Sequence, residues 1–96
     1  MDQKELYRKK MQAELDEWKA ELDKLEARAK KADADTKLKV DEKVKELKNK
    51  IDEGQSKLNE LADSSGEAWE SLKDGIDSAW GALKSGFNDA TAKFKE

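Results

Sequence analysis

The sequence contains no cysteine, no histidine and no proline. Without cysteine the chain forms neither disulfides nor thiolate sites, and without histidine it lacks the residue that most often transfers protons near neutral pH. Paired carboxylates remain, such as Glu14 with Glu17 and Asp74 with Asp77, but they fall on exposed faces of predicted helices with no candidate pocket. We therefore expect no catalytic, cofactor-binding or metal-binding residues, and no enzyme activity.

Long apolar runs and a strong net charge are missing too. No apolar stretch approaches the roughly 18 residues of a membrane span, and residues 1–5 lack the apolar core of a signal peptide, so the expected location is cytoplasmic. The net charge is only -3, and acidic residues flank the basic clusters at 8–10 and 30–31. A nucleic-acid partner is not expected, because the electrostatic footprint of such a binder is absent.

What the chain has in excess is charge of both signs. Charged residues make up 45% of its 96 positions, nearly twice the usual share of about 25%. Low hydrophobicity with many charges is compatible with disorder, but disordered chains usually carry proline and lack ordered apolar spacing. Ordered spacing is present here, so the composition indicates long helices with exposed charged faces.

Two apolar stripes occupy the first two thirds of the chain, each with the alternating steps of three and four that place residues on one side of a helix. The first comprises Met11, Leu15, Trp18, Leu22, Leu25, Ala29 and Ala32. The second comprises Val40, Val44, Leu47, Ile51, Leu58 and Leu61, with Gly54 where another apolar residue is due. Residues 1–62 are thus predicted as a long charged coiled-coil segment.

The second stripe is displaced by one residue from the first, which predicts a bend between 32 and 36. Acid-base pairs four residues apart, such as Asp33 with Lys37 and Asp35 with Lys39, favour an unbroken helix through it. The polar run at 33–36 instead offers side chains that compete with helical backbone bonds. Both a bent helix and a complete break remain open.

A clear stop signal lies at 63–66, followed by a third segment at 67–96. Ser64 and Glu67 match the spacing of a capping box, with Ser64 as the N-cap of the following helix. The segment repeats every eleven residues, a period that keeps an apolar stripe almost straight along a helix. Its amphipathic face lies within an arc of roughly 80° and comprises Trp69, Leu72, Ile76, Trp80, Leu83, Phe87 and Phe94.

This C-terminal face has two interpretations. It can pack against the earlier stripes or another copy of the chain, or it can lie on a membrane surface with its aromatic residues among the lipids. Gly75, Gly81 and Gly86 each weaken the isolated helix by about 1 kcal/mol, which favours close helix packing or folding on contact. Together with this face, Trp18, Leu22 and Leu25 form the predicted packing surface.

The predicted fold is all-α, either an antiparallel coiled-coil hairpin or an elongated three-helix bundle. One narrow stripe per helix buries little apolar area, so we expect self-association to a dimer or tetramer. The expected function is non-catalytic interaction or scaffolding through pairing with itself or with client helices. Peripheral membrane binding by the C-terminal helix is the alternative.

Three motifs carry a resemblance over nearly all of the chain. They are Leu15-Asp16-Glu17-Trp18, the stretch 43–47, and Ser65-Gly66-Glu67-Ala68-Trp69-Glu70-Ser71-Leu72-Lys73 with its echo around Trp80. With them the chain resembles short bacterial coiled-coil proteins known as stress-response proteins, which implies a role under stress and brings no active site. The eleven-residue period also resembles apolipoprotein-like and desiccation-protectant helices.

Overall fold

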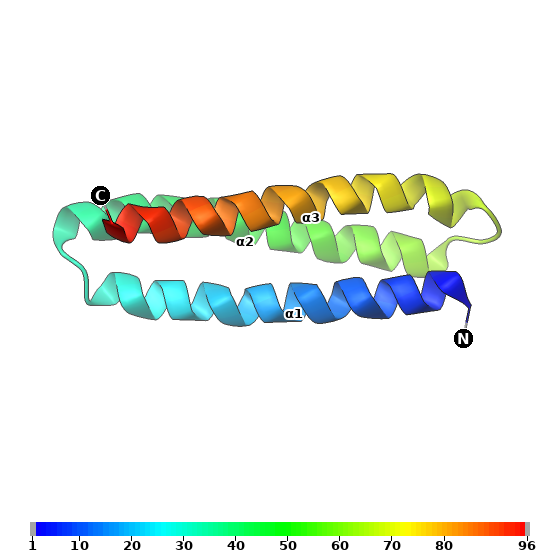
Figure 1. The fold of residues 1–96 in the computed structure, drawn as a ribbon, viewed down its shortest axis with the longest axis horizontal. Coiled ribbons are helices and arrows are strands. Elements are labelled where there is room, and N and C mark those ends of the chain that lie inside the picture. The colour runs from blue at the N-terminus through cyan, green and yellow to red at the C-terminus, as the bar shows by residue number, and fades with distance from the viewer. Residues whose placement is uncertain (1, 96) are drawn as a thin grey trace.

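The computed structural model describes residues 2–95, which form three long helices. They are α1 (Gln3–Lys30), α2 (Ala34–Asp63) and α3 (Ala68–Ala92), and a short 3-10 helix η1 (Lys93–Lys95) follows. The helices lie side by side, and the chain reverses direction at each connection (Figure 1). The body measures 51 × 19 × 17 Å. No strand occurs in the described range, so the all-α prediction is confirmed.

The helix is interrupted completely between α1 and α2. Helix α1 ends at Lys30, and the side chain of Asp33 accepts a 2.8 Å hydrogen bond from the backbone N–H of Thr36, which makes Asp33 the N-cap of α2. This hydrogen bond, made by a backbone donor, lowers the pKa of the Asp33 carboxyl from its ordinary value. The acid-base pairing of Asp33 with Lys37 therefore does not continue the helix, because the aspartate caps a new one.

The second connection differs from the predicted capping box. Ser64 is the C-cap of α2, with extended backbone angles, and its hydroxyl donates a 2.7 Å hydrogen bond to the carbonyl of Leu61. Glu67 occupies the cap position of α3, but no side-chain hydrogen bond forms there. The prediction that Ser64 caps α3 is wrong. Gly66, at φ 57°, inserts a left-handed turn, so α3 starts too far along the chain for Ser64 to reach its first turn.

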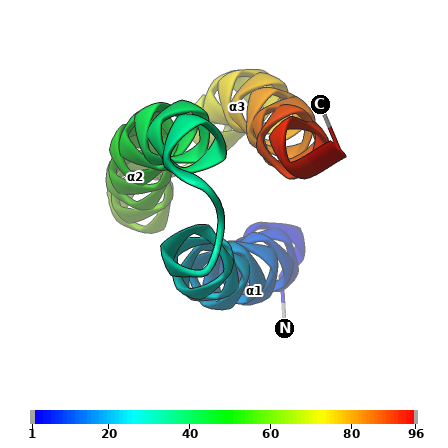
Figure 2. The same cartoon turned by 90° about the vertical axis from the view of Figure 1, so that its left-hand side faces the viewer.

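The core is a column of aliphatic and aromatic side chains enclosed by the three helices. Seen end-on, the helices stand at the corners of a triangle (Figure 2). The buried residues of each helix recur at steps of three and four, which points them at the other two helices. They are Met11, Leu15, Leu22, Leu25, Ala29, Val40, Val44, Leu47, Ile51, Leu58, Leu61, Ile76, Trp80, Leu83, Phe87 and Ala90.

Two glycines let α2 and α3 approach each other closely. A Cβ built on Gly54 would lie 3.1 Å from the outer edge of the Trp80 ring, and one built on Gly86 would lie 2.8 Å from Cδ2 of Leu47. Gly54 thus provides the space that the Trp80 ring fills, and Gly86 the space for Leu47. Cβ atoms on Gly75 and Gly81 would meet no atom within 4 Å, so no packing contact requires glycine there.

This difference predicts opposite effects of alanine along α3. Gly75→Ala and Gly81→Ala are each expected to raise the free energy of unfolding by about 0.5–1 kcal/mol, because alanine costs less backbone entropy in a helix. Gly86→Ala has the same gain but must displace Leu47, so we expect it to be about 1–3 kcal/mol less stable than Gly75→Ala. Urea unfolding of the three variants measures this. Equal stabilisation by all three would show that Gly86 does not mark a close contact.

Candidate interaction surface

Aromatic side chains form the link between α1 and α3. Helix α1 packs closely on α2 but only sparsely on α3. The aromatic seam, as we name this link, comprises Tyr7 and Trp18 of α1, Trp69, Trp80 and Phe87 of α3, and Phe94 of η1. Large rings bridge two helices whose backbones make few close approaches, because each aromatic side chain reaches further than an aliphatic one.

Contacts of the seam run from one end of the bundle to the other. Near the N-terminus, the ring centroids of Tyr7 and Trp69 are 6.2 Å apart and tilted by 43°. At the centre, Trp18 meets Trp80 edge-on at 5.9 Å and stacks on Phe87 at 6.2 Å and 14°. Such aromatic pairs contribute about 0.5–1.5 kcal/mol beyond their buried area. These aromatic contacts therefore stabilise the packing of α3 on α1.

A cation–π contact lies at the other end of the seam. The guanidinium of Arg28 lies 4.1 Å from the centroid of the Phe94 ring, within the range of a cation–π interaction. Phe94 belongs to η1, so the contact attaches the last described turn of the chain to the C-terminal end of α1. Arg28 is exposed, and such a contact at an exposed site contributes about 0.5–1 kcal/mol.

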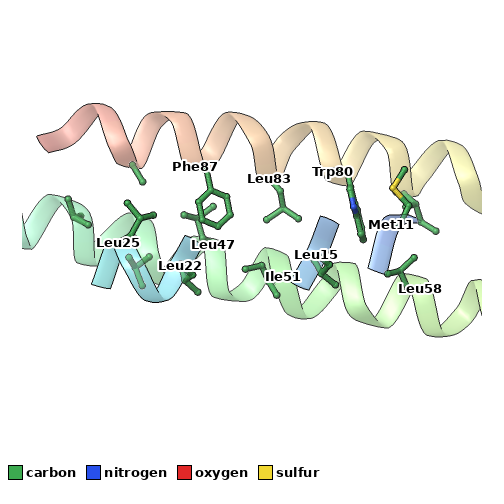
Figure 3. Packing of buried hydrophobic residues seen from close by; sticks show 14 of the residues in the cluster. Met11, Leu15, Leu22, Leu25, Leu47, Ile51, Leu58, Trp80, Leu83 and Phe87 are labelled. Atoms are coloured by element: carbon green, nitrogen blue, oxygen red, sulfur yellow. The ribbon is translucent and has the colours of Figure 1, made fainter. Parts of the chain in front are cut away.

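Trp80 lies at the centre of the seam and is 5% exposed. Its ring points from α3 toward α2 in the close view of the core (Figure 3), where the ring edge and Cδ1 of Leu15 both lie beside Gly54. In the part of the chain that the structure describes, its Nε1–H is buried without a hydrogen-bond partner. A buried donor without a partner costs about 1–3 kcal/mol, which offsets part of the stability gained by packing this ring.

Tyr7 adds a polar clasp beside the seam. Its hydroxyl donates a 2.5 Å hydrogen bond to Oδ1 of Asp77 and lies 3.2 Å from the backbone oxygen of Lys73. Burial raises the pKa of Tyr7 well above its ordinary value, and the hydrogen bond to Asp77 and the negative charges of Asp77, Glu14 and Asp74 raise it further. The neutral phenol is therefore the form that the folded state favours.

Substitution of Tyr7 should reveal this clasp through pH. Tyr7→Phe is expected to lower the free energy of unfolding by about 0.5–1 kcal/mol near neutral pH, the value of one partly exposed hydrogen bond. The folded pKa is raised, so the contribution of Tyr7 is complete below the unfolded pKa of about 10 and is lost as pH rises above it. Urea unfolding at neutral and alkaline pH should show the two proteins converging. A constant difference between them would contradict the role of the phenol proton.

The structure brings the predicted packing residues together in one cluster. Leu22 and Leu25 of α1 and the α3 residues Ile76, Trp80, Leu83 and Phe87 are buried, while Trp18, Trp69, Leu72 and Phe94 are half-buried against them. Sequence reasoning missed Tyr7 and Arg28. Tyr7 lies four residues before Met11, on the extension of the first apolar stripe, so the spacing alone could have identified it.

Polar side chains also join α1 to α2. The side-chain amides of Gln12 and Gln55 exchange two 2.9 Å hydrogen bonds, and Lys48 pairs with Glu26 at 3.1 Å. The Lys48–Glu26 ion pair is largely exposed and adds little stability, whereas the amide pair is partly buried.

Other surface features are weaker candidates. A hollow between α1 and α2 is lined by lysines, among them Lys45 and Lys48, but Glu26 and Asp41 lie in the same wall and reduce its positive charge. Among residues 2–95, no group of three or more carboxylates is placed to hold a metal ion, and none of the described helices is long and apolar enough to cross a membrane. Comparisons of this chain with protein-family models, curated proteins and solved structures find no match.

Proposed function

We propose that this chain is a non-catalytic interaction and scaffolding protein that pairs with a second copy of itself along the aromatic seam. The observation that supports it is the half-buried state of Tyr7, Trp18, Trp69 and Phe94, which lie along the contact between α1 and α3 from one end of the bundle to the other. Half-buried aromatic residues are typical of interface centres, where a partner completes their burial. The resemblance noted above extends the proposal to a role under stress, and the proposed location is the cytoplasm.

The proposal also covers how α1 and α2 pack against each other. Residues at steps of three and four on α1 and α2, together with the facing pairs Gln12–Gln55 and Glu26–Lys48, favour an antiparallel coiled coil for these two helices. In the proposed assembly this hairpin is the rigid part, and α1 and α3 both contribute aromatic residues to the contact with the second copy, Tyr7 and Trp18 from α1 and Trp69 from α3.

The size of the molecule suits such pairing. One long side of a body 51 Å long and 17 Å wide projects roughly 870 Å², the product of the two dimensions. Stable interfaces bury about 800 Å² on each partner. A lengthwise contact between two copies therefore reaches the necessary area, whereas an end-to-end contact, limited to 19 × 17 Å, does not.

Sedimentation equilibrium over a range of concentrations tests the proposal. We expect the wild type to form a dimer, and Trp18→Ala to shift the equilibrium at least tenfold toward monomer while far-ultraviolet circular dichroism remains helical. Leu38→Ala is the matched control, because Leu38 is 65% exposed and lies outside the seam. A wild type that is monomeric throughout, or an equal shift in both variants, would refute pairing along the seam.

A further inference from the structure

Helix α3 differs from the other two helices in its charge. Half or more of the residues of α1 and α2 are charged, 15 of 28 and 15 of 30, against 6 of 25 in α3. Those six are Glu70, Lys73, Asp74, Asp77, Lys84 and Asp89, which gives α3 a net charge of -2. The helix therefore has neither the dense charge of an ordinary solvated helix nor an attraction for anionic surfaces.

Small uncharged residues replace charge on the outer side of α3. The exposed positions of this side include Ser71, Gly75, Ser78, Ala82 and Ser85. The opposite side presents Trp69, Ile76, Trp80, Leu83 and Phe87, among the largest side chains of the chain. An amphipathic helix with a bulky apolar face and a weakly charged polar face binds lipid mainly by inserting apolar side chains, because electrostatic attraction to headgroups is small.

The docked position of α3 leaves one of its polar groups without a partner. Among residues 2–95 the Trp80 Nε1–H finds no acceptor, whereas water and lipid carbonyl groups at a membrane interface would accept its hydrogen bond. Undocking would satisfy this donor, which offsets part of the cost of moving α3 away from α1 and α2.

We propose that α3 leaves the hairpin and lies on the surface of a neutral, loosely packed bilayer, with Trp80 and Phe87 inserted into defects between lipids. The partner is thus a lipid surface selected by packing, not by charge. Some 25 residues at 1.5 Å each give a helix of about 37 Å, long enough to span several such defects. This activity is separate from pairing between copies, and it goes beyond general membrane attachment by naming the lipid property that is sensed.

Vesicle flotation with purified full-length protein tests the lipid preference. Three probes are needed: small sonicated vesicles of dioleoylphosphatidylcholine, large extruded vesicles of the same lipid, and large vesicles that also contain phosphatidylserine. We expect at least tenfold more protein bound to the small neutral vesicles than to either large type. Binding that follows phosphatidylserine content, binding independent of vesicle size, or no binding to any vesicle would each overturn the proposal.

A reversible lock tests whether α3 must undock. Leu47→Cys with Gly86→Cys introduces two thiols at a close contact between α2 and α3, where a Cβ on Gly86 would lie 2.8 Å from Cδ2 of Leu47, and the chain has no other cysteine. The oxidised protein should lose binding to small neutral vesicles, and the same protein after reduction should regain it. The single variant Leu47→Cys controls for the oxidant, because it keeps Gly86 and adds no side chain to the close contact. Equal binding before and after reduction would show that α3 stays docked, and would overturn the proposed mechanism.

Hydrogen–deuterium exchange gives an independent readout on the wild type. When small neutral vesicles are added, amides of α1 and α2 that face the core should exchange faster, because α3 no longer covers them, while α3 remains protected as a helix in the interface. Unchanged exchange in α1 and α2 in vesicle-bound protein would contradict undocking.

Discussion

Trp80→Ala is expected to lower the free energy of unfolding by about 3–5 kcal/mol, the range for removal of a large buried aromatic side chain. Trp80 is 5% exposed, contacts Trp18 edge-on and fills the space beside Gly54. Alanine would leave a cavity that three packed helices cannot close. A domain of this size is typically stable by about 5–15 kcal/mol, so the variant should lie near the limit of folding. Urea unfolding followed by circular dichroism measures the loss.

Two matched variants separate packing from hydrogen bonding at this position. Trp80→Phe keeps a ring and removes the unpaired Nε1–H, so its cost should be well below that of alanine. Trp69→Ala removes the same side chain from a half-buried site at the end of the bundle, and should also cost less. If Trp80→Ala and Trp69→Ala were equally mild, Trp80 would not be a core residue.

Leu15→Ala is expected to lower the free energy of unfolding by about 2–5 kcal/mol. Leu15 is fully buried, and its Cδ1 lies 3.5 Å from the position of a Cβ on Gly54, so it packs where all three helices meet. The cost combines the lost transfer of apolar atoms from water with the cavity left behind. Thermal and urea unfolding should agree on the loss if the bundle unfolds as one unit.

Leu6→Ala is the control for this substitution. Leu6 lies on the same helix but is 54% exposed, so the identical change should alter stability by no more than about 0.5 kcal/mol. The contrast tests the orientation of α1 directly, since a rotation of the helix would change which leucine is buried. Similar losses from both variants would contradict the packing described here.

The sequence predicts the buried faces well, because residues spaced three and four positions apart lie on the same side of an α-helix. Gly54 illustrates this. It stands where an apolar residue is due on the second stripe, and in the fold the Trp80 ring occupies the space that its missing side chain leaves. The pairing of this glycine with a tryptophan 26 positions later depends on how α2 and α3 are placed, which periodicity within one helix does not encode.

The helix ends were less predictable. The residues next to Asp33 in the sequence are compatible with a continuous helix and with a helix break. The outcome depends on whether the Asp33 side chain accepts the hydrogen bond of the Thr36 backbone N–H or the helical backbone hydrogen bonds continue. Ser64 and Glu67 have capping-box spacing, yet the left-handed Gly66 between them moves the start of α3. Caps involve single hydrogen bonds of about 1 kcal/mol, so small tertiary effects outweigh them.

A double-mutant cycle on Trp18 and Phe87 tests the aromatic link between α1 and α3 most directly. Their rings stack at 6.2 Å and 14°. Stabilities of the wild type, Trp18→Ala, Phe87→Ala and the double variant should give a coupling energy of about 0.5–1.5 kcal/mol in favour of the pair. A coupling energy of zero, with both single variants folded, would mean that α3 does not pack on α1 through this seam.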